Sequence, residues 1–258
     1  MGRSGNFGVS SRVSQCIERL TGDHMIRSVL RGLAVLGVAL MAVAMFSNRG
    51  SSAPTILPGA TTGADLAPAA GEEVAIFSGG CFWGVQAVFQ HMKGVKSAVS
   101  GYTGGSLKNP SYEQVSTGST GHAESVRIVF DPSQVSYADL LRVFFSVATD
   151  PTELNYQGPD HGTQYRSAIW YTTPEQQRTA KAYIDQLTKA KVYQNKIVTE
   201  VKPAQPFYDA EGYHQDYATL HPDDRYIAYN DTPKVENFKK LLPTLYRDQP
   251  VLVGSAQQ

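Results

Sequence analysis

The sequence has only two cysteines in 258 residues, Cys16 and Cys81, and no excess charge of either sign. Two cysteines cannot build the disulfide framework of a small secreted domain. Lysine plus arginine and aspartate plus glutamate both number 23, so no net field attracts a polyanion, and nucleic acid is not expected as a partner. The length and the hydrophobic fraction of 41% are typical of a globular chain with one large domain or two small ones.

Long apolar runs are scarce, and the run near the N-terminus is short. Residues 25–46 combine Arg27 and Arg31 with an apolar run of roughly 14 residues, below the ~20 that a spanning helix needs. This pattern is typical of a secretory signal, with Met25 as an alternative start, and a retained membrane anchor stays open. More basic residues precede the run than closely follow it. We therefore expect export to a bacterial periplasm or to the outer face of the inner membrane rather than a cytoplasmic location.

Composition divides the chain into four parts. Residues 1–46 form the leader, and residues 47–72 predict a flexible linker because they are rich in glycine, alanine, serine, threonine and proline without apolar periodicity. Residues 73–247 are expected to form the folded domain, and residues 248–258 a C-terminal tail.

Strands and helices alternate from residue 73 onward. The pattern of residues 123–130 is half-exposed, which is typical of antiparallel pairing, so we expect an α+β fold in which helices pack on a mixed β-sheet. Apolar runs and alternation predict strands over residues 74–80, 95–105, 123–130, 167–172 and 196–203. Helical spacing predicts helices over residues 81–92, 136–148 and 173–191.

Cys81 stands where the first strand gives way to the first helix, in "SGGCFWG". A cysteine in the first turn of a helix faces unpaired backbone N–H groups and the positive end of the helix dipole, so we expect a lowered pKa and a reactive thiolate. Gly80 and Gly84 leave room for backbone or substrate to approach, while Phe82 and Trp83 add an apolar surface beside the sulfur. The alternative is a small hydrophobic side chain in the core.

Five motifs resemble the peptide methionine sulfoxide reductase A family. They are "GCFWG", "GYTGG", "GHAESVRIVFDP", "DPTELNYQGPDHGTQYRSAI" and "YDAEGYHQDY", in the family's order from residue 73 to at least residue 230. The resemblance implies a two-layer, ferredoxin-like sandwich with long loops. It also implies thiol-dependent reduction of free and protein-bound methionine S-sulfoxide to methionine, and hence repair of proteins after oxidative stress.

The resemblance also assigns roles to individual residues. A thiol that takes the oxygen of a sulfoxide needs an acid nearby, because the departing oxygen must receive a proton. Glu124 in "GHAES" matches the family's proton donor, and burial beside aromatics would keep it protonated near neutrality. Tyr112 and Tyr165 match phenols that hydrogen-bond the sulfoxide oxygen. The substrate-binding residues implied are Phe82 and Trp83, as a wall around the methyl group, and Asp160, which helps order the site.

A zinc site, one other enzyme class and one binding module are the alternatives to this interpretation. A zinc site is not expected, because no recognised ligand spacing links Cys81 to the candidate histidine ligands, which are His122, His161, His214 and His221. A cysteine–histidine hydrolase would give no role to Glu124. A membrane-tethered module that binds oxidised methionine without turning it over stays open.

The polar residues of "HQDY" (214–217), with Glu211 before them, are expected to support the pocket.

Recycling of the enzyme is expected to depend on another molecule. Oxygen transfer leaves Cys81 as a sulfenic acid, which many relatives reduce with a second cysteine. Ser116 lies where some relatives carry that cysteine, and Cys16 would be removed with a cleaved leader or held across the membrane from Cys81. We therefore expect an external thiol reductant such as a thioredoxin-like protein, no metal or organic cofactor, and a monomer.

Overall fold

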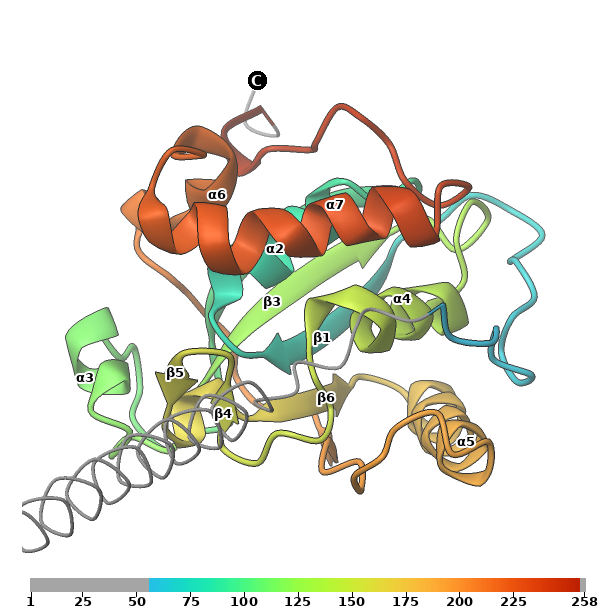
Figure 1. Cartoon of the computed structure of the whole chain (residues 1–258), viewed down its shortest axis with the longest axis horizontal. Helices are drawn as coiled ribbons and strands as arrows, with labels where there is room; N and C mark the ends of the chain where they lie inside the picture. The colour runs from blue at the N-terminus through green and yellow to red at the C-terminus, as the bar shows by residue number, and fades with distance from the viewer. Residues whose placement is uncertain (1–55, 256–258) are drawn as a thin grey trace, which may run out of the picture. The chain divides into compact units, whose positions relative to one another are not determined.

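The computed structural model describes residues 56–255, which form a sheet with helices against it (Figure 1). All three pairings between the four central strands are antiparallel, in the order β6-β1-β3-β2. Helix α2 (Phe82–Gln90) joins β1 to β2, and helix α4 (Tyr137–Val143) lies between β3 and β6 in the chain. This is the βαββαβ connectivity of ferredoxin-like folds. The four strands are β1 (Glu73–Gly79), β2 (Val95–Thr103), β3 (Ala123–Phe130) and β6 (Ser167–Tyr171).

Two short strands complete the sheet at its edges. Strand β7 (Glu200–Pro203) runs parallel to β6, and strand β8 (Tyr208–Asp209) runs antiparallel to β2. The sheet is therefore mixed, as the sequence predicts. Only the second half of the expected strand 196–203 is extended in the sheet, and β8 was not predicted because two residues are too few to show alternation.

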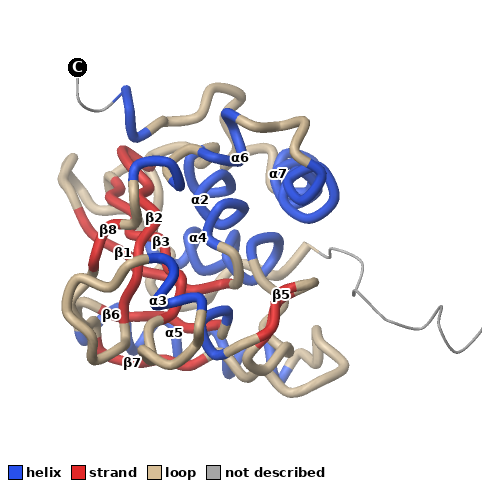
Figure 2. Tube along the Cα trace, turned by 90° about the vertical axis from the view of Figure 1, so that its left-hand side faces the viewer, coloured by secondary structure: helices blue, strands red, loops and turns tan. Residues whose placement is uncertain are grey.

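The main core lies between the sheet and its helices. Ala75 and Phe77 of β1 belong to this core with residues of α2, α4 and α5 (Pro174–Lys189), while Ile76 joins a smaller cluster with Trp170 on the opposite face. Alternate residues of a strand point to opposite faces, so β1 separates the two clusters. Figure 2 shows α2 and α4 beside the same face of the sheet. The expected two-layer α+β sandwich is confirmed.

Local sequence signals set the helix ends. Ser136 accepts a hydrogen bond from the backbone N–H of Asp139 and caps α4, and Thr173 accepts one from the backbone N–H of Gln176 and caps α5. The predicted helix over residues 136–148 changes into a π-helical turn, η1 (Phe144–Ala148), after α4. Its Phe144 ring stacks on Phe77 at 4.9 Å, so the turn carries core side chains.

The remaining described elements are mostly short and lie on the long connections of the chain. Their bounds are α3 (Tyr112–Ser116), β4 (Tyr156–Gln157), β5 (Asp160–His161), η2 (Thr163–Tyr165), η3 (Gly212–His214), α6 (Tyr217–Leu220), η4 (Ile227–Asp231), α7 (Thr232–Leu241) and η5 (Val253–Ser255).

Packing begins earlier than the composition of residues 47–72 predicts. Leu57 is 2% exposed, and its carbonyl accepts a hydrogen bond from Arg142 Nε at 2.9 Å. The carbonyl of Pro58 accepts another from the Tyr183 hydroxyl at 2.7 Å. The structure therefore attaches at least these residues of the predicted linker to α4 and α5, because one apolar side chain and two backbone carbonyls suffice to anchor an otherwise polar segment.

The predicted leader, residues 1–46, and Cys16 within it lie outside the described residues. Among residues 56–255, no helix is long and apolar enough to cross a membrane.

Candidate active site

Cys81 is the residue that caps the N-terminus of α2, immediately after β1. The chain turns there through Gly80, whose φ of 98° suits glycine and whose missing side chain would lie 2.5 Å from Gln157 Cβ. Cys81 is 8% exposed, and the backbone N–H of Trp83 donates a hydrogen bond to it. The helix N-terminus therefore contacts the thiol as the sequence predicts.

The predicted lowering of the Cys81 pKa is wrong for the free protein. Burial raises the pKa of this thiol well above its ordinary value, and the nearby carboxylates Glu124 and Asp231 raise it further. The Trp83 N–H and the Lys234 ammonium oppose that rise without reversing it. Cys81 is consequently a protonated thiol at neutral pH, because desolvation outweighs the favourable end of the helix.

Glu124 lies on β3 directly beside the start of α2. Its side chain is 2% exposed, and its Oε2 accepts a hydrogen bond from the backbone N–H of Phe82 at 3.0 Å. Burial raises its pKa from 4.5 to about 8, Asp160 and Asp231 add to this, and the Phe82 N–H opposes it. A carboxyl with this pKa holds a proton at neutral pH. Glu124 is thus a proton donor that contacts Phe82, the residue that follows Cys81.

Tyr112 and Tyr165 come from separate loops into the same site. The backbone N–H of Tyr112, the first residue of α3, donates to Glu211 Oε1 at 2.9 Å, and Tyr165 ends the 3-10 turn η2. Burial raises the pKa of both phenols, and the charges of Glu124 and Cys81 raise them further. Both phenols therefore keep their O–H donors, which the predicted contact with an oxygen requires.

The two predicted aromatic wall residues differ in exposure. Phe82 is 1% exposed and packs between the rings of Tyr102 and His214, at 5.8 and 5.1 Å. Trp83 is half-buried and stacks on the Tyr217 ring at 4.1 Å, while its Nε1–H donates to His214 Nδ1 at 3.2 Å. Trp83 thus offers open apolar surface beside Cys81, and Phe82 supports the site from behind.

Asp160 is held by a residue that sequence reasoning missed. The hydroxyl of Tyr226, just before η4, donates a hydrogen bond to Asp160 Oδ2. The Tyr226 ring meets Trp83 edge-on at 5.9 Å. The phenol therefore joins β5 to the first turn of α2 and fixes the Asp160 carboxyl, whose charge raises the pKa of Glu124.

Asp231 is the second residue that was missed. It is 1% exposed, and a Cβ added at Gly84 would lie 2.1 Å from Asp231 Oδ1. The room that Gly84 leaves is therefore filled by this carboxyl rather than by substrate. A glycine inside a helix does signal close approach of another group, but it does not say which group.

The predicted support role of "HQDY" agrees with its contacts. Gln215 Oε1 accepts hydrogen bonds from Gln86 Nε2 at 2.8 Å and from the backbone N–H of Ser100 at 3.0 Å. Asp216 Oδ1 accepts from Gln90 Nε2 and from the backbone N–H of Val253. These bonds join α2 to β2 and to the C-terminal segment, and so hold the helix that carries Cys81.

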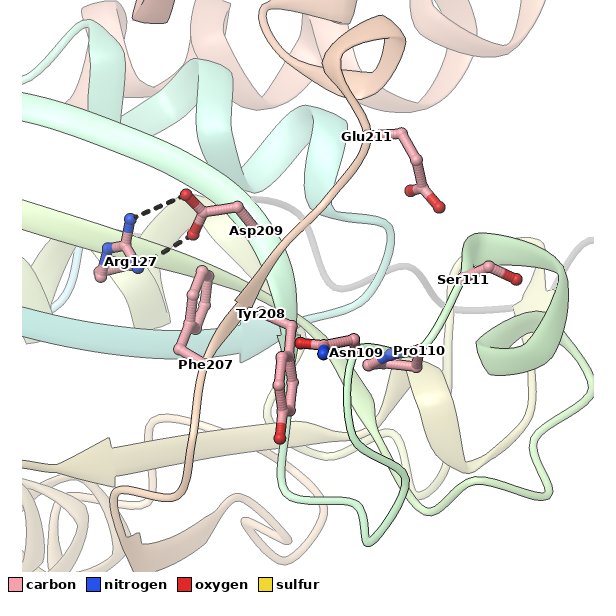
Figure 3. A pocket seen from close by; sticks show the side chains of 8 residues that line it. All are labelled: Asn109, Pro110, Ser111, Arg127, Phe207, Tyr208, Asp209 and Glu211. Atoms are coloured by element: carbon pink, nitrogen blue, oxygen red, sulfur yellow. Dashed lines mark hydrogen bonds and ion pairs between the residues drawn. The ribbon is translucent and has the colours of Figure 1, made fainter.

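A separate pocket of about 640 Å³ opens beside Tyr112 (Figure 3). Glu211 stands at one end, and its carboxylate also accepts a hydrogen bond from the Tyr102 hydroxyl at 2.9 Å. Arg127 and Asp209 form an ion pair at the other end, at 2.9 Å. None of the predicted site residues lines this pocket. Its lining consists of Asn109, Pro110, Ser111, Arg127, Phe207, Tyr208, Asp209 and Glu211.

The histidines do not assemble a metal site in the part of the chain that the structure describes, where no three potential ligands gather. His122 is committed to the backbone, since its Nδ1 accepts from the Gly105 N–H and its Nε2 lies 2.8 Å from the Leu107 carbonyl oxygen. The charged groups that act most strongly on Cys81 are Glu124, Asp231 and Lys234. A cysteine–histidine hydrolase is therefore not favoured.

Comparison with known proteins gives a consistent set of relatives. The family model described as peptide methionine sulfoxide reductase matches residues 73–244. A peptide methionine sulfoxide reductase MsrA 2 of Mesorhizobium japonicum is 60% identical over 192 residues, which cover 74% of this chain and 98% of that protein. A second MsrA 2, of Synechocystis, is 51% identical and covers 67% of this chain and 80% of its own length.

Solved structures give the same result for the fold. Reduced Mxr1 of Saccharomyces cerevisiae matches with a TM-score of 0.53 and 31% identity, covering 62% of this chain and 90% of that one. Methionine sulfoxide reductase A of Corynebacterium diphtheriae matches with a TM-score of 0.51 and 34% identity, covering 67% of this chain and 87% of its own.

Proposed function

The chain belongs to the peptide methionine sulfoxide reductase family, and we propose that it reduces methionine S-sulfoxide, free or within proteins, to methionine. This activity is that of a peptide-methionine (S)-S-oxide reductase, an oxidoreductase that repairs oxidised proteins. The observation that carries the proposal is the pairing of the Cys81 thiol with a Glu124 carboxyl whose pKa of about 8 keeps its proton at neutral pH.

The residues account for both halves of the reaction. The Cys81 sulfur attacks the sulfoxide sulfur, and Glu124 gives its proton to the oxygen as negative charge develops there. The oxygen then passes to Cys81, so that a thiol and a sulfoxide become a sulfenic acid and a thioether. The thiol proton returns to the Glu124 carboxylate, which leaves the acid ready for another cycle. The sulfoxide is reduced by two electrons, and Cys81 is oxidised by two.

The remaining site residues orient the substrate in this proposal. The hydroxyls of Tyr112 and Tyr165 donate hydrogen bonds to the sulfoxide oxygen, which concentrates charge during the attack. The open face of Trp83 contacts the methyl group, with Phe82 behind it, and Asp160 orders the site through Tyr226.

Selective loss of one sulfoxide epimer tests the proposed function. We expect the protein, with an excess of a small dithiol, to consume the S epimer of a methionine sulfoxide peptide and to leave the R epimer. Chromatographic separation of the two epimers and of the methionine product measures both. Binding of the peptide without methionine formation would instead support a non-catalytic binding module.

The reductant in this proposal is an external thiol, such as a thioredoxin-like protein. Cys81 is the free cysteine among the described residues, and Ser116 donates its hydroxyl to the Tyr112 carbonyl oxygen at 2.7 Å instead of supplying a second thiol. An attacking thiol reaches the sulfenic acid and forms a mixed disulfide that a second thiol resolves.

Cys16→Ser is expected to leave the dithiol-supported turnover rate unchanged. Peptide mapping without reduction is expected to find Cys81 joined to the added thiol and never to Cys16. A large loss of turnover in Cys16→Ser, together with a Cys16–Cys81 disulfide in the wild type, would contradict recycling by an external thiol.

The proposed location is outside the cytoplasm, with the leader either cleaved or kept as a membrane anchor. Support comes from the basic residues before a short apolar run. Mass spectrometry of the mature N-terminus from fractionated cells distinguishes cleavage from anchoring. Recovery of residues 1–24 on a cytoplasmic protein would contradict export.

A further inference from the structure

A buried ion pair beside Cys81 has no role in the reaction described above. Asp231 is the last residue of η4, and Lys234 lies in the first turn of α7. Lys234 Nζ is 3.2 Å from Asp231 Oδ1, and the two side chains are 23% and 1% exposed. A carboxylate that is buried to this extent is costly to the fold, so its position calls for a functional explanation.

The Asp231 carboxyl lies against the helix turn that begins at Cys81. Gly84 is in this turn, and any larger residue there would place its Cβ 2.1 Å from Asp231 Oδ1. The other oxygen, Oδ2, is buried without a hydrogen-bond partner among residues 56–255. Lys234 therefore contacts one oxygen of Asp231 and leaves the other without a partner, and the two charges act on the thiol in opposite directions.

The other groups around Cys81 come from five further elements or loops. Glu124 on β3 opposes ionisation of the thiol when it is charged, but its pKa of about 8 keeps it mostly neutral at pH 7. The phenols of Tyr112, Tyr165 and Tyr226 are neutral there as well, since burial raises the pKa of each. Asp160 on β5 acts on Glu124 and Asp231. Burial raises the pKa of Asp231, but the Lys234 ammonium 3.2 Å away opposes this rise and favours the carboxylate. Asp231 and Lys234 are then the opposing charges that act on the sulfur near neutral pH, and above pH 8 Glu124 joins Asp231 in opposing ionisation of the thiol.

We propose that Asp231 and Lys234 are positioning residues whose balance of charge sets how readily the Cys81 thiol ionises. Burial holds the resting cysteine as a thiol, Asp231 strengthens this effect and Lys234 limits it. Since the thiolate is the form that reacts with alkylating agents and oxidants, the pair restrains Cys81 when no substrate is bound. The inference rests on the proposed role of Cys81 as nucleophile.

The pH dependence of Cys81 alkylation tests the proposal without using any sulfoxide. The full chain is treated with iodoacetamide over a range of pH, and mass spectrometry of the Cys81 peptide separates its reaction from that of Cys16. We expect the midpoint to move to lower pH in Asp231→Asn. Below the midpoints of both proteins, a variant whose midpoint is one pH unit lower reacts about tenfold faster than the wild type at the same pH. We expect the midpoint to move to higher pH in Lys234→Met.

Lys239→Met is the matched control. Lys239 lies on the same helix as Lys234, but it is exposed and pairs with Asp248, so its removal is expected to leave the midpoint unchanged. Loosening of the structure would admit water to the thiol and lower the midpoint in either variant, whereas the proposal predicts opposite shifts in Asp231→Asn and Lys234→Met. An unchanged midpoint in folded Asp231→Asn, or a downward shift in Lys234→Met, would overturn the proposal. If Asp231→Asn does not fold, Lys234→Met decides alone. Failure of this test leaves the epimer assay unaffected, so the two outcomes are distinguishable.

Discussion

Cys81→Ser is expected to reduce methionine formation to the background of the uncatalysed reaction. A serine hydroxyl is small enough to occupy the same place at the start of α2, but it cannot take up the oxygen as the Cys81 thiol does when it becomes a sulfenic acid. The measurement is methionine released from an S-sulfoxide peptide with excess dithiol.

Cys16→Ser is the matched control for this result, because it removes the other thiol of the chain and leaves the nucleophile in place. We expect it to retain the wild-type rate. Methionine formation by Cys81→Ser at more than a small fraction of the wild-type rate would contradict the assignment of the nucleophile.

Glu124→Gln is expected to lower the rate of methionine formation by about 10²- to 10⁴-fold, the usual contribution of a positioned general acid. Glutamine keeps the shape of the side chain and an oxygen that can accept the Phe82 N–H, but it has no acidic proton to give. The wild-type rate constant for oxygen transfer is expected to fall above the Glu124 pKa of about 8, as the carboxyl loses its proton. Single-turnover rates over a range of pH measure both effects.

The corresponding pH limb is expected to be absent in Glu124→Gln. A glutamine variant with nearly wild-type activity, or a wild-type profile that rises through pH 8, would contradict the role of Glu124 as the acid.

Stability gives an independent readout of the same pKa. Because the folded pKa of Glu124 lies above its ordinary value of 4.5, the folded protein binds more protons than the unfolded chain between pH 4.5 and about 8. Glu124 therefore makes the free energy of unfolding fall as pH rises through this window. We expect the fall to be smaller in Glu124→Gln, measured by urea unfolding at the two ends of the window.

The sequence predicted the members of the site better than their electrostatics. The strand-to-helix junction at Cys81 follows from local patterns that one segment contains, and both neighbouring elements form where expected. The direction of the Cys81 pKa depends on burial and on Glu124 and Asp231, which reach it from β3 and η4. Periodicity along one segment says nothing about the charges that distant segments bring to it, so the predicted thiolate was wrong.

The same limit explains the residues that were missed. Asp231 and Tyr226 lie in "RYIAYND", which has neither a motif of known chemistry nor a simple helical pattern, and η4 forms a π-helical turn there. Only the fold places this segment against the first turn of α2, where Gly84 leaves room for the carboxyl. By contrast, Glu124 was found through the resemblance of "GHAES" to the peptide methionine sulfoxide reductase A family, and it lies on β3, which pairs with both β1 and β2.

The central claim is that one thiol, Cys81, takes the sulfoxide oxygen without help from another redox group. The direct measurement is a single turnover with the reduced protein, an S-sulfoxide peptide and no added thiol. The account predicts about one methionine per protein molecule and a Cys81 peptide that gains one oxygen atom, trapped as a sulfenic acid adduct. One equivalent of methionine with a Cys16–Cys81 disulfide in place of the sulfenic acid, or methionine formed while Cys81 stays unmodified, would contradict it.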